Sequence, residues 1–245
     1  MTVQPVVKTT DMLNSIPYTF KLEALSEFDV VEIIKGGLLD DAVKCIDGSI
    51  ERKFNECKLR YFGASATAGT VSTSGTAAGT NTSSFNAYHV RRMVDELKKR
   101  NVPGWSGLGG DYVCICSVEA LSGLYADVES VWQYTESGYN KVLNGEVGRY
   151  YGCRFVEDTY ATRYTYSASA RTSTAKSWAQ GKSLDAYMFG SPTVREAIVV
   201  PEEIRVKVTT DYGRSKGIAW YFLGGWAIEW DTQADCRIIK WDSLA

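Results

Sequence analysis

The chain has 245 residues, of which 44% are hydrophobic and 23% are charged, and its 27 basic and 29 acidic side chains leave a net charge of −2. A chain of this size buries a substantial core as one domain or two closely joined ones, and its weak net charge disfavours a dedicated nucleic-acid binder. No apolar run reaches the roughly 20 residues of a membrane span and no charged-then-apolar leader follows Met1, so we expect synthesis in a cytoplasm and no membrane partner.

The first segment, VQPVVKTTDMLN, is rich in β-branched residues and predicts a strand that ends at Pro17. A long helix is predicted next, with Ser26 as its N-cap and apolar residues recurring close to a period of 3.6 until about Tyr61. At about 1.5 Å per residue, this helix is roughly 50 Å long. Gly36 and Gly37 lie inside it and indicate either a kink or a close backbone contact.

Residues 63–84 consist almost entirely of Gly, Ala, Ser and Thr and carry no charge. Such a segment cannot bury enough apolar surface to offset the entropy lost on ordering. We therefore predict a flexible surface loop, which is either packed near neighbouring chains or tolerated as a simple insertion.

Asn86 is predicted to cap a second helix, in which Val90, Val94 and Leu97 form the apolar stripe. This helix also carries a cluster of cations, which either contact phosphates or form a solvated helix face. The cations are Arg91, Arg92, Lys98, Lys99 and Arg100. The uninterrupted apolar middle of DYVCICS then predicts a central buried strand, and VEALSGLYAD predicts a short helix capped near Ser117.

The six cysteines lack the density of a small disulfide-stapled domain, so we expect reduced and mostly buried thiols. Cys114 and Cys116 belong to the predicted central strand, where alternation places both sulfur atoms on one face. A zinc site would need a second close pair, and the single histidine, His89, is remote in sequence. We therefore interpret the pair as strand core and expect neither a metal nor a cofactor.

The second half of the chain is predicted to be mainly β-structure. Residues 160–184 are rich in Ser and Thr and predict a loop or hairpin before the strand DAYMFG. The segment AIVVPEEIRVKVTT alternates, with Ile204, Val206 and Val208 on one face. GIAWYFLGGWAIEW predicts a strand pair around Gly224 and Gly225, and CRIIKW predicts a further strand.

Three segments together carry a resemblance to a known family. They are LNGEVGRYYGCRFVEDT at 143–159, DAYMFG at 185–190 and TDYGRSKGIAW at 210–220. In this order and spacing they resemble the major capsid proteins of tailed double-stranded DNA bacteriophages. The resemblance implies an α+β Hong Kong 97-type capsid fold with a long spine helix. It also implies a peripheral domain of residues 1–62 with about 200–225, and an axial domain of 85–199 with 226–245.

The function implied by this resemblance is that of a structural subunit of an icosahedral capsid. The subunit would self-assemble into hexamers and pentamers and enclose the double-stranded DNA genome. Its partners would be copies of itself, scaffold, portal and decoration proteins, and packaged DNA bound without sequence specificity. It would be made in the bacterial host cytoplasm and reside in the virion capsid. Relatives carry an N-terminal arm and an extended loop before the first strand of this chain, so we expect the chain alone to associate weakly.

Two other function classes are alternatives. An encapsulin-like nanocompartment shell would share the fold and hold a cargo protein instead of DNA. An enzyme would have to use His89 or carboxylate pairs such as Glu202-Glu203 and Glu157-Asp158. Adjacent residues of a strand point to opposite faces, so these pairs would not converge, and we expect no catalytic site.

Charged residues in two glycine-flanked turns are the candidate subunit-interface residues. They are Glu146 and Arg149 in NGEVGRY, and Asp211, Arg214 and Lys216 in TDYGRSKG. These segments are too polar for a core. Their charges either join neighbouring copies or belong to ordinary solvated turns.

Overall fold

The structure, a computed structural model, describes residues 7–76, 81, 83–132, 146–159, 164–167, 172–175 and 185–241. The chain divides into two compact units. Unit 1 comprises Met1–Pro5, Glu51–Val194 and Ile228–Ala245, and unit 2 comprises Val6–Ile50 and Arg195–Ala227. In the described part of the chain, no helix has the length and hydropathy needed to cross a membrane.

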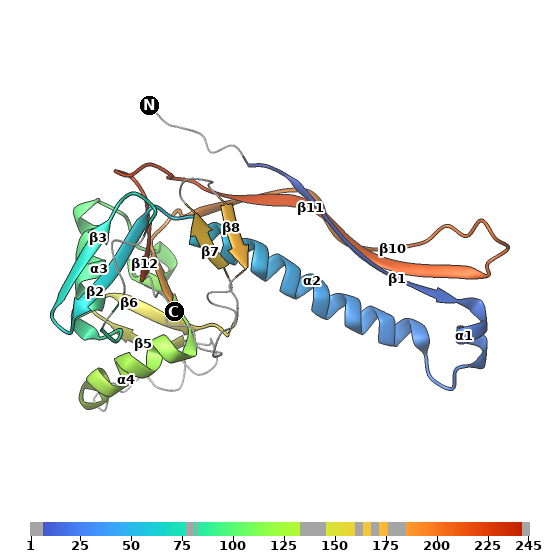
Figure 1. The fold of residues 1–245 in the computed structure, drawn as a ribbon, viewed down its shortest axis with the longest axis horizontal. Helices are drawn as coiled ribbons and strands as arrows, with labels where there is room; N and C mark the ends of the chain where they lie inside the picture. Colours follow the sequence, from blue (N-terminus) through green and yellow to red (C-terminus); the bar gives the residue numbers. More distant parts are fainter. Residues whose placement is uncertain are drawn as a thin grey trace. The chain divides into compact units, whose positions relative to one another are not determined.

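Helices and strands are mixed along the chain, which agrees with the predicted α+β class (Figure 1). The helices are α1 (Phe20–Leu25), α2 (Val30–Asn55), α3 (Ala87–Lys99) and α4 (Val118–Trp132), with a 3-10 helix at Ser106–Leu108. The strands are β1 (Thr10–Thr19), β2 (Leu59–Ser65), β3 (Ala68–Ser72), β4 (Tyr112–Cys116), β5 (Glu146–Tyr150), β6 (Cys153–Glu157), β7 (Tyr164–Ser167), β8 (Thr172–Ala175), β9 (Ala186–Phe189), β10 (Val194–Val206), β11 (Ser215–Ile228) and β12 (Ile238–Trp241).

Unit 1 is built on a seven-stranded sheet with the order β3-β2-β12-β9-β4-β6-β5. β4 lies inside this sheet, antiparallel to β9 and parallel to β6, which confirms the predicted central strand. Cys114 and Cys116 are buried, and their sulfur atoms lie 3.3 Å apart on one face. Burial raises the pKa of the Cys116 thiol. Because the thiolate is the reactive form, this buried cysteine has little tendency to react.

The two predicted caps in unit 1 are confirmed. The side-chain oxygen of Asn86 accepts a hydrogen bond from the backbone NH of His89 at 3.1 Å and starts α3. Ser117 Oγ accepts one from the backbone NH of Ala120 at 3.3 Å and starts α4. The predicted stripe of α3 is buried, and this helix packs against α4 and β9.

Unit 2 consists of a three-stranded sheet in the order β1-β11-β10, with α2 along one face (Figure 1). β1 runs antiparallel to β11, from Thr10 opposite Gly224 to Thr19 opposite Ser215. The core of this unit is small, because α2 and one face of β11 supply most of it. Its buried apolar residues are Ile34, Leu38, Ala42, Ile218, Trp220, Phe222 and Trp226.

One carboxylate fastens α2 to this sheet. Asp41 Oδ2 accepts hydrogen bonds from Asn14 Nδ2 of β1 and from Trp220 Nε1 of β11, each at 2.9 Å. These hydrogen bonds lower the pKa of Asp41 below its ordinary value. Charge-assisted bonds from two strands therefore supplement the small apolar core.

The bounds of the long helix differ from the prediction. α2 begins at Val30 because Asp29 Oδ1 accepts hydrogen bonds from the backbone NH groups of Val31 at 2.9 Å and Glu32 at 3.2 Å. Ser26 instead ends α1, a short helix that was not predicted. The C-terminal end is Asn55 rather than about Tyr61, because residues 59–61 pair with β12 as part of β2.

Two predictions about strand interruptions are wrong. β1 continues through Pro17 and is an edge strand. An edge strand tolerates proline because the backbone on its outer side forms no hydrogen bonds to another strand. β11 is one continuous strand where a pair around Gly224 and Gly225 was predicted. A Cβ atom at Gly224 would lie 2.4 Å from the Phe222 ring, and one at Gly225 would lie 2.2 Å from the carbonyl oxygen of Lys8. These glycines therefore permit close packing and do not form a turn.

Part of the segment predicted as a flexible loop is ordered as strand. Residues 63–65 end β2 and residues 68–72 form β3, which pairs with β2 in antiparallel register. Gly69 packs on Tyr61, where a Cβ atom would lie 2.2 Å from the phenol oxygen. Residues 77–80 and 82 lie outside the described residues, as does most of 160–184. Within the latter segment, β7 and β8 pair as an antiparallel hairpin.

Candidate assembly surface

Exposed apolar side chains are concentrated on unit 2, although it is the smaller unit. Among the described residues, the large apolar side chains that are exposed in unit 1 are those of Val118, Tyr125 and Tyr151. Those exposed in unit 2 are Leu13, Ile16, Phe20, Leu22, Leu25, Phe28, Ile33, Leu39, Val43, Ile198, Val199, Ile204, Val206, Val208 and Tyr212. Monomeric soluble proteins rarely expose so much apolar surface together, so another molecule is expected to cover unit 2.

One group of these side chains surrounds α1, none of whose six residues is buried. Leu25 is 74% exposed, and Phe28, just after the helix, is 71% exposed. The backbone NH of Phe20 donates to the carbonyl oxygen of Arg214 at 3.1 Å, and Lys216 Nζ lies 2.7 Å from Glu23 Oε2. A helix this short is unstable alone. These polar contacts hold it in place while its apolar side chains point outward.

The turn between β10 and β11 adds two further exposed residues, Val208 and Tyr212. Tyr212 is 110% exposed, with φ +54°, and Gly213 follows with φ +85°. Two successive positive φ angles are typical of a tight hairpin turn, but tyrosine rarely occupies that region. We call the set Phe20, Leu22, Leu25, Phe28, Val208 and Tyr212 the tip surface. The Phe20–Arg214 hydrogen bond joins its two parts.

The outer face of α2 also carries exposed apolar side chains among charged ones. Ile33, Leu39 and Val43 are exposed on it, opposite the buried stripe. At Gly36 and Gly37, an added Cβ atom would meet no described atom within 4 Å. The predicted close backbone contact is therefore not made by the described part of this chain.

Three of the predicted interface residues lie beside the tip surface. Asp211 Oδ1 accepts a hydrogen bond from the backbone NH of Ser215 at 3.2 Å and so stabilises the turn. Lys216 Nζ lies 5.2 Å from the centre of the Phe20 ring, and its hydrogen bond to Glu23 raises the pKa of Lys216. Arg214 contacts α1 through its backbone. These contacts position the tip, and a role of the three charges between copies stays a prediction.

The other two predicted residues belong to unit 1, whereas the first three belong to unit 2. Glu146 and Arg149 belong to β5, an edge strand, and not to a turn. Arg149 Nη2 lies 2.8 Å from Asp111 Oδ1, and Arg154 Nε lies 3.0 Å from Asp111 Oδ2. Asp111 is buried, so Arg149 has a structural partner within its own chain. The side chain of Glu146 lies outside the described residues.

The cations of α3 are largely engaged within unit 1. Arg91 Nε donates to Tyr150 Oη at 2.6 Å, and its guanidinium lies over the rings of Tyr150 and Tyr151. Lys98 Nζ lies 4.9 Å from the centre of the Tyr151 ring. These cation–π contacts favour a structural interpretation of the cluster over a phosphate-binding one.

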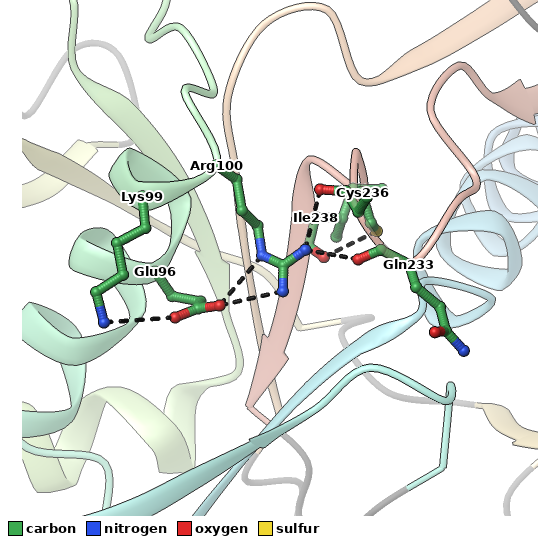
Figure 2. Close-up of polar contacts among 7 residues, drawn as sticks. Glu96, Lys99, Arg100, Gln233, Cys236 and Ile238 are labelled. Atoms are coloured by element: carbon green, nitrogen blue, oxygen red, sulfur yellow. Dashed lines mark hydrogen bonds and ion pairs between the residues drawn. The ribbon is translucent and has the colours of Figure 1, made fainter.

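Arg100 has a similar structural role at the end of α3 (Figure 2). Its Nη2 lies 3.1 Å from Glu96 Oε1, and its Nη1 donates to the carbonyl oxygens of Gln233 at 2.6 Å and Ala234 at 3.0 Å. The guanidinium therefore fastens the helix to the segment that leads into β12.

The sequence matches no protein-family model and no curated protein, whereas the structure resembles solved phage capsids over nearly its whole length. For the capsid of Ralstonia phage GP4, the TM-score is 0.67 at 14% identity, over 98% of this chain and 74% of that one. For the Helicobacter pylori bacteriophage KHP30 capsid, it is 0.64 at 13% identity, over 98% and 76%. For the capsid of Cyanophage P-SCSP1u, it is 0.63 at 13% identity, over 98% and 73%.

The chain has the fold of phage capsid proteins. This confirms, at the level of fold, the resemblance carried by the three sequence motifs. Within this capsid fold, the candidate functional site is the exposed apolar surface of unit 2. This surface was not predicted from the sequence, because α1 was not predicted and the candidate interface residues were charged ones.

Proposed function

We propose that this protein is a structural subunit of an icosahedral phage capsid, which self-assembles into hexamers and pentamers and encloses the double-stranded DNA genome. The supporting observation is the concentration of exposed apolar side chains on unit 2 of a chain with the capsid fold. The partner in this proposal is another copy of the same chain, because most soluble oligomers are closed homo-oligomers.

Energetics favour many weak contacts over one strong contact. Covering a large apolar side chain contributes about 1.5–3 kcal/mol, so the six residues of the tip surface contribute on the order of 10 kcal/mol. Association of two proteins costs an estimated 4–15 kcal/mol in lost freedom. A single contact is therefore marginal, and a closed shell, in which every subunit makes several contacts, is stable.

Charge is compatible with this arrangement. The net charge of −2 gives neighbouring copies little mutual repulsion and gives DNA little general attraction. Enclosed DNA would thus be held mainly by the closed shell, with non-specific contacts. The same proposal places the protein in the virion capsid after synthesis in the host cytoplasm, with scaffold, portal and decoration proteins as further partners.

A non-enzymatic role fits the environment of the single histidine. His89 is buried, its Nδ1 lies 3.0 Å from Tyr61 Oη, and its Nε2 lies 3.2 Å from Ser83 Oγ. Burial lowers the pKa of this imidazole. The ring is thus a core group with both nitrogen atoms engaged, out of reach of a substrate.

Sedimentation velocity of the purified chain over a range of concentrations, followed by negative-stain electron microscopy, tests the proposal. We expect a mass that rises with concentration, together with rings of five or six copies or closed shells. A strictly monomeric chain at its highest soluble concentration would contradict self-assembly. Shells that contain a protein cargo and no nucleic acid would support the encapsulin-like alternative.

A further inference from the structure

The two larger sheets of the described chain have four open edges. These are β3 and β5 at the ends of the sheet of unit 1, and β1 and β10 at the ends of the sheet of unit 2. At an open edge, backbone NH and C=O groups face away from the sheet, so the edge can pair with a strand of another molecule. Proteins block such pairing with charged side chains or proline in the edge strand. An edge that lacks both is open to a partner strand.

Three of these four edge strands carry blocking residues. They are Asp11 and Pro17 in β1, Glu146 and Arg149 in β5, and Pro201, Glu202 and Glu203 in β10. β3 has neither proline nor a charged residue, and residues 63–84, which contain it, carry no charge. β3 is therefore the unblocked edge of the two larger sheets.

The inner side of β3 is firmly held by the sheet of unit 1. β3 pairs with β2, which in turn pairs with β12, and no described strand lies on the other side of β3 (Figure 1). Gly69 packs on the ring of the buried Tyr61, whereas Thr70, opposite Phe62, is exposed. The edge is thus ordered before a partner arrives, so pairing does not carry the entropic cost of ordering β3.

The composition of the four edges favours β3 of a second copy as the partner strand. Pairing with β1, β5 or β10 of another copy would bring proline or charged residues to the contact, whereas a second β3 brings neither. In an antiparallel pair centred on Thr70, this residue lies opposite itself on a two-fold axis, and Ala68 of each copy lies opposite Ser72 of the other. Threonines in directly opposite positions stabilise antiparallel strands, and this register places no like charges together.

We infer that β3 pairs with β3 of a second copy, antiparallel and with Thr70 on the two-fold axis, so that two sheets of unit 1 join into one. Backbone hydrogen bonds supply most of the affinity in this mode of recognition. Because the strand is short, the contact is weak alone and gains strength where the same copies also meet elsewhere. The proposed function rests on the surface of unit 2, so either proposal can fail without the other.

Cysteine crosslinking tests both the pairing and its register. Among the described cysteines, Cys45 is the exposed one, so Cys45→Ser provides the background. Thr70→Cys should give a covalent dimer as the main product of mild oxidation with glutathione disulfide, because the two thiols meet on the axis. Ala68→Cys and Ser72→Cys should not dimerise when each is oxidised alone, because equivalent residues lie about 13 Å apart at about 3.3 Å per residue. A mixture of these two variants should give the dimer.

Charge at the axis provides the matched comparison. Thr70→Lys places like charges opposite each other, so the mixture of Ala68→Cys and Ser72→Cys should lose its dimer when both chains also carry this change. Thr70→Gln adds a long side chain without charge and should keep the dimer. Thr70 is exposed, so both variants should fold like wild type, which circular dichroism verifies.

The same crosslinking in a chain that also carries Leu25→Ser and Phe28→Ser separates this contact from the tip surface. We expect the Thr70→Cys dimer to persist there, because both changes lie in unit 2. Loss of the dimer in that chain would assign it to the tip surface and overturn the inference. Absence of a dimer from Thr70→Cys, or an equal yield from Ala68→Cys or Ser72→Cys alone, would also overturn it.

Discussion

The tip surface allows a sharp test of assembly through replacement of Leu25 and Phe28 by serine. Both side chains are mostly exposed in the single chain, at 74% and 71%. Substitutions at such positions usually change the free energy of unfolding by no more than about 0.5 kcal/mol. The double variant should therefore fold with wild-type stability, and any loss of association can be attributed to the surface.

The expected loss of association free energy follows from the exposed fractions of these two side chains. Complete burial of a leucine or phenylalanine side chain contributes about 1.5–3 kcal/mol, so covering the exposed part of each contributes about 1–2 kcal/mol. Loss of both weakens every contact that covers them by about 2–4 kcal/mol. At 1.4 kcal/mol per factor of ten, the dissociation constant should rise about 30-fold to 700-fold.

Sedimentation velocity over a concentration series measures this change, with circular dichroism to verify folding. Val118→Ser is the matched control, because Val118 is an exposed apolar residue of unit 1. We expect the control to associate like wild type. If the Leu25/Phe28 double variant associates as strongly as the control, the tip surface is not the contact between copies and this reasoning is refuted.

Three further predictions concern stability. Alanine at both Gly36 and Gly37 should stabilise the protein by about 1 kcal/mol per position and raise Tm by a few degrees. Both glycines are exposed inside a helix, where alanine is the more favourable residue. A lower Tm in thermal denaturation would contradict this prediction. Burial holds the pKa of His89 below its ordinary 6.5, so as the pH falls the unfolded chain binds a proton before the folded chain does. The stability that this neutral histidine contributes is therefore complete above pH 6.5 and decreases as the pH falls below that value. Urea denaturation between about pH 8 and pH 5 should show a steeper loss for wild type than for His89→Gln; equal slopes would assign the loss to other groups. Arg149→Glu should lower the free energy of unfolding by about 1–3 kcal/mol, because it places a second carboxylate beside the buried Asp111. Arg149→Gln should lower it by less. Equal free energies of unfolding for the two variants in chemical denaturation would refute this ion pair.

Helices and strands that are determined by neighbouring residues in the sequence could be predicted from it. Asn86 and Ser117 were identified as caps because each immediately precedes an apolar helical pattern. The inner strand β4 followed from an uninterrupted apolar run. The start of α2 was missed because Ser26 and Asp29 are both good caps. The choice between them depends on α1, which is held by Arg214 and Lys216, far along the chain.

The candidate site depends on distant parts of the chain and could not be predicted in the same way. Phe20 and Leu25 have the composition of core residues, and only the fold shows that they are uncovered. Arg149 was predicted to be a candidate interface residue in a turn, because its partner Asp111 is remote in sequence. The open edge of β3 likewise depends on the pairing of β3 with β2, whereas the sequence predicted a flexible loop at these residues. Local sequence patterns predicted the helices and strands, whereas the exposure of side chains and the pairing of residues distant in sequence were visible only in the structure.

We propose that copies of this chain cover the apolar surface of unit 2 when they build a shell. Cryo-electron microscopy of particles purified from cells that express the chain tests this claim most directly. We predict icosahedral shells or five- and six-membered rings in which Leu25, Phe28 and Tyr212 are buried between neighbouring subunits. Particles in which these side chains remain exposed to solvent, or a preparation that contains only single chains at its highest soluble concentration, would contradict this proposal.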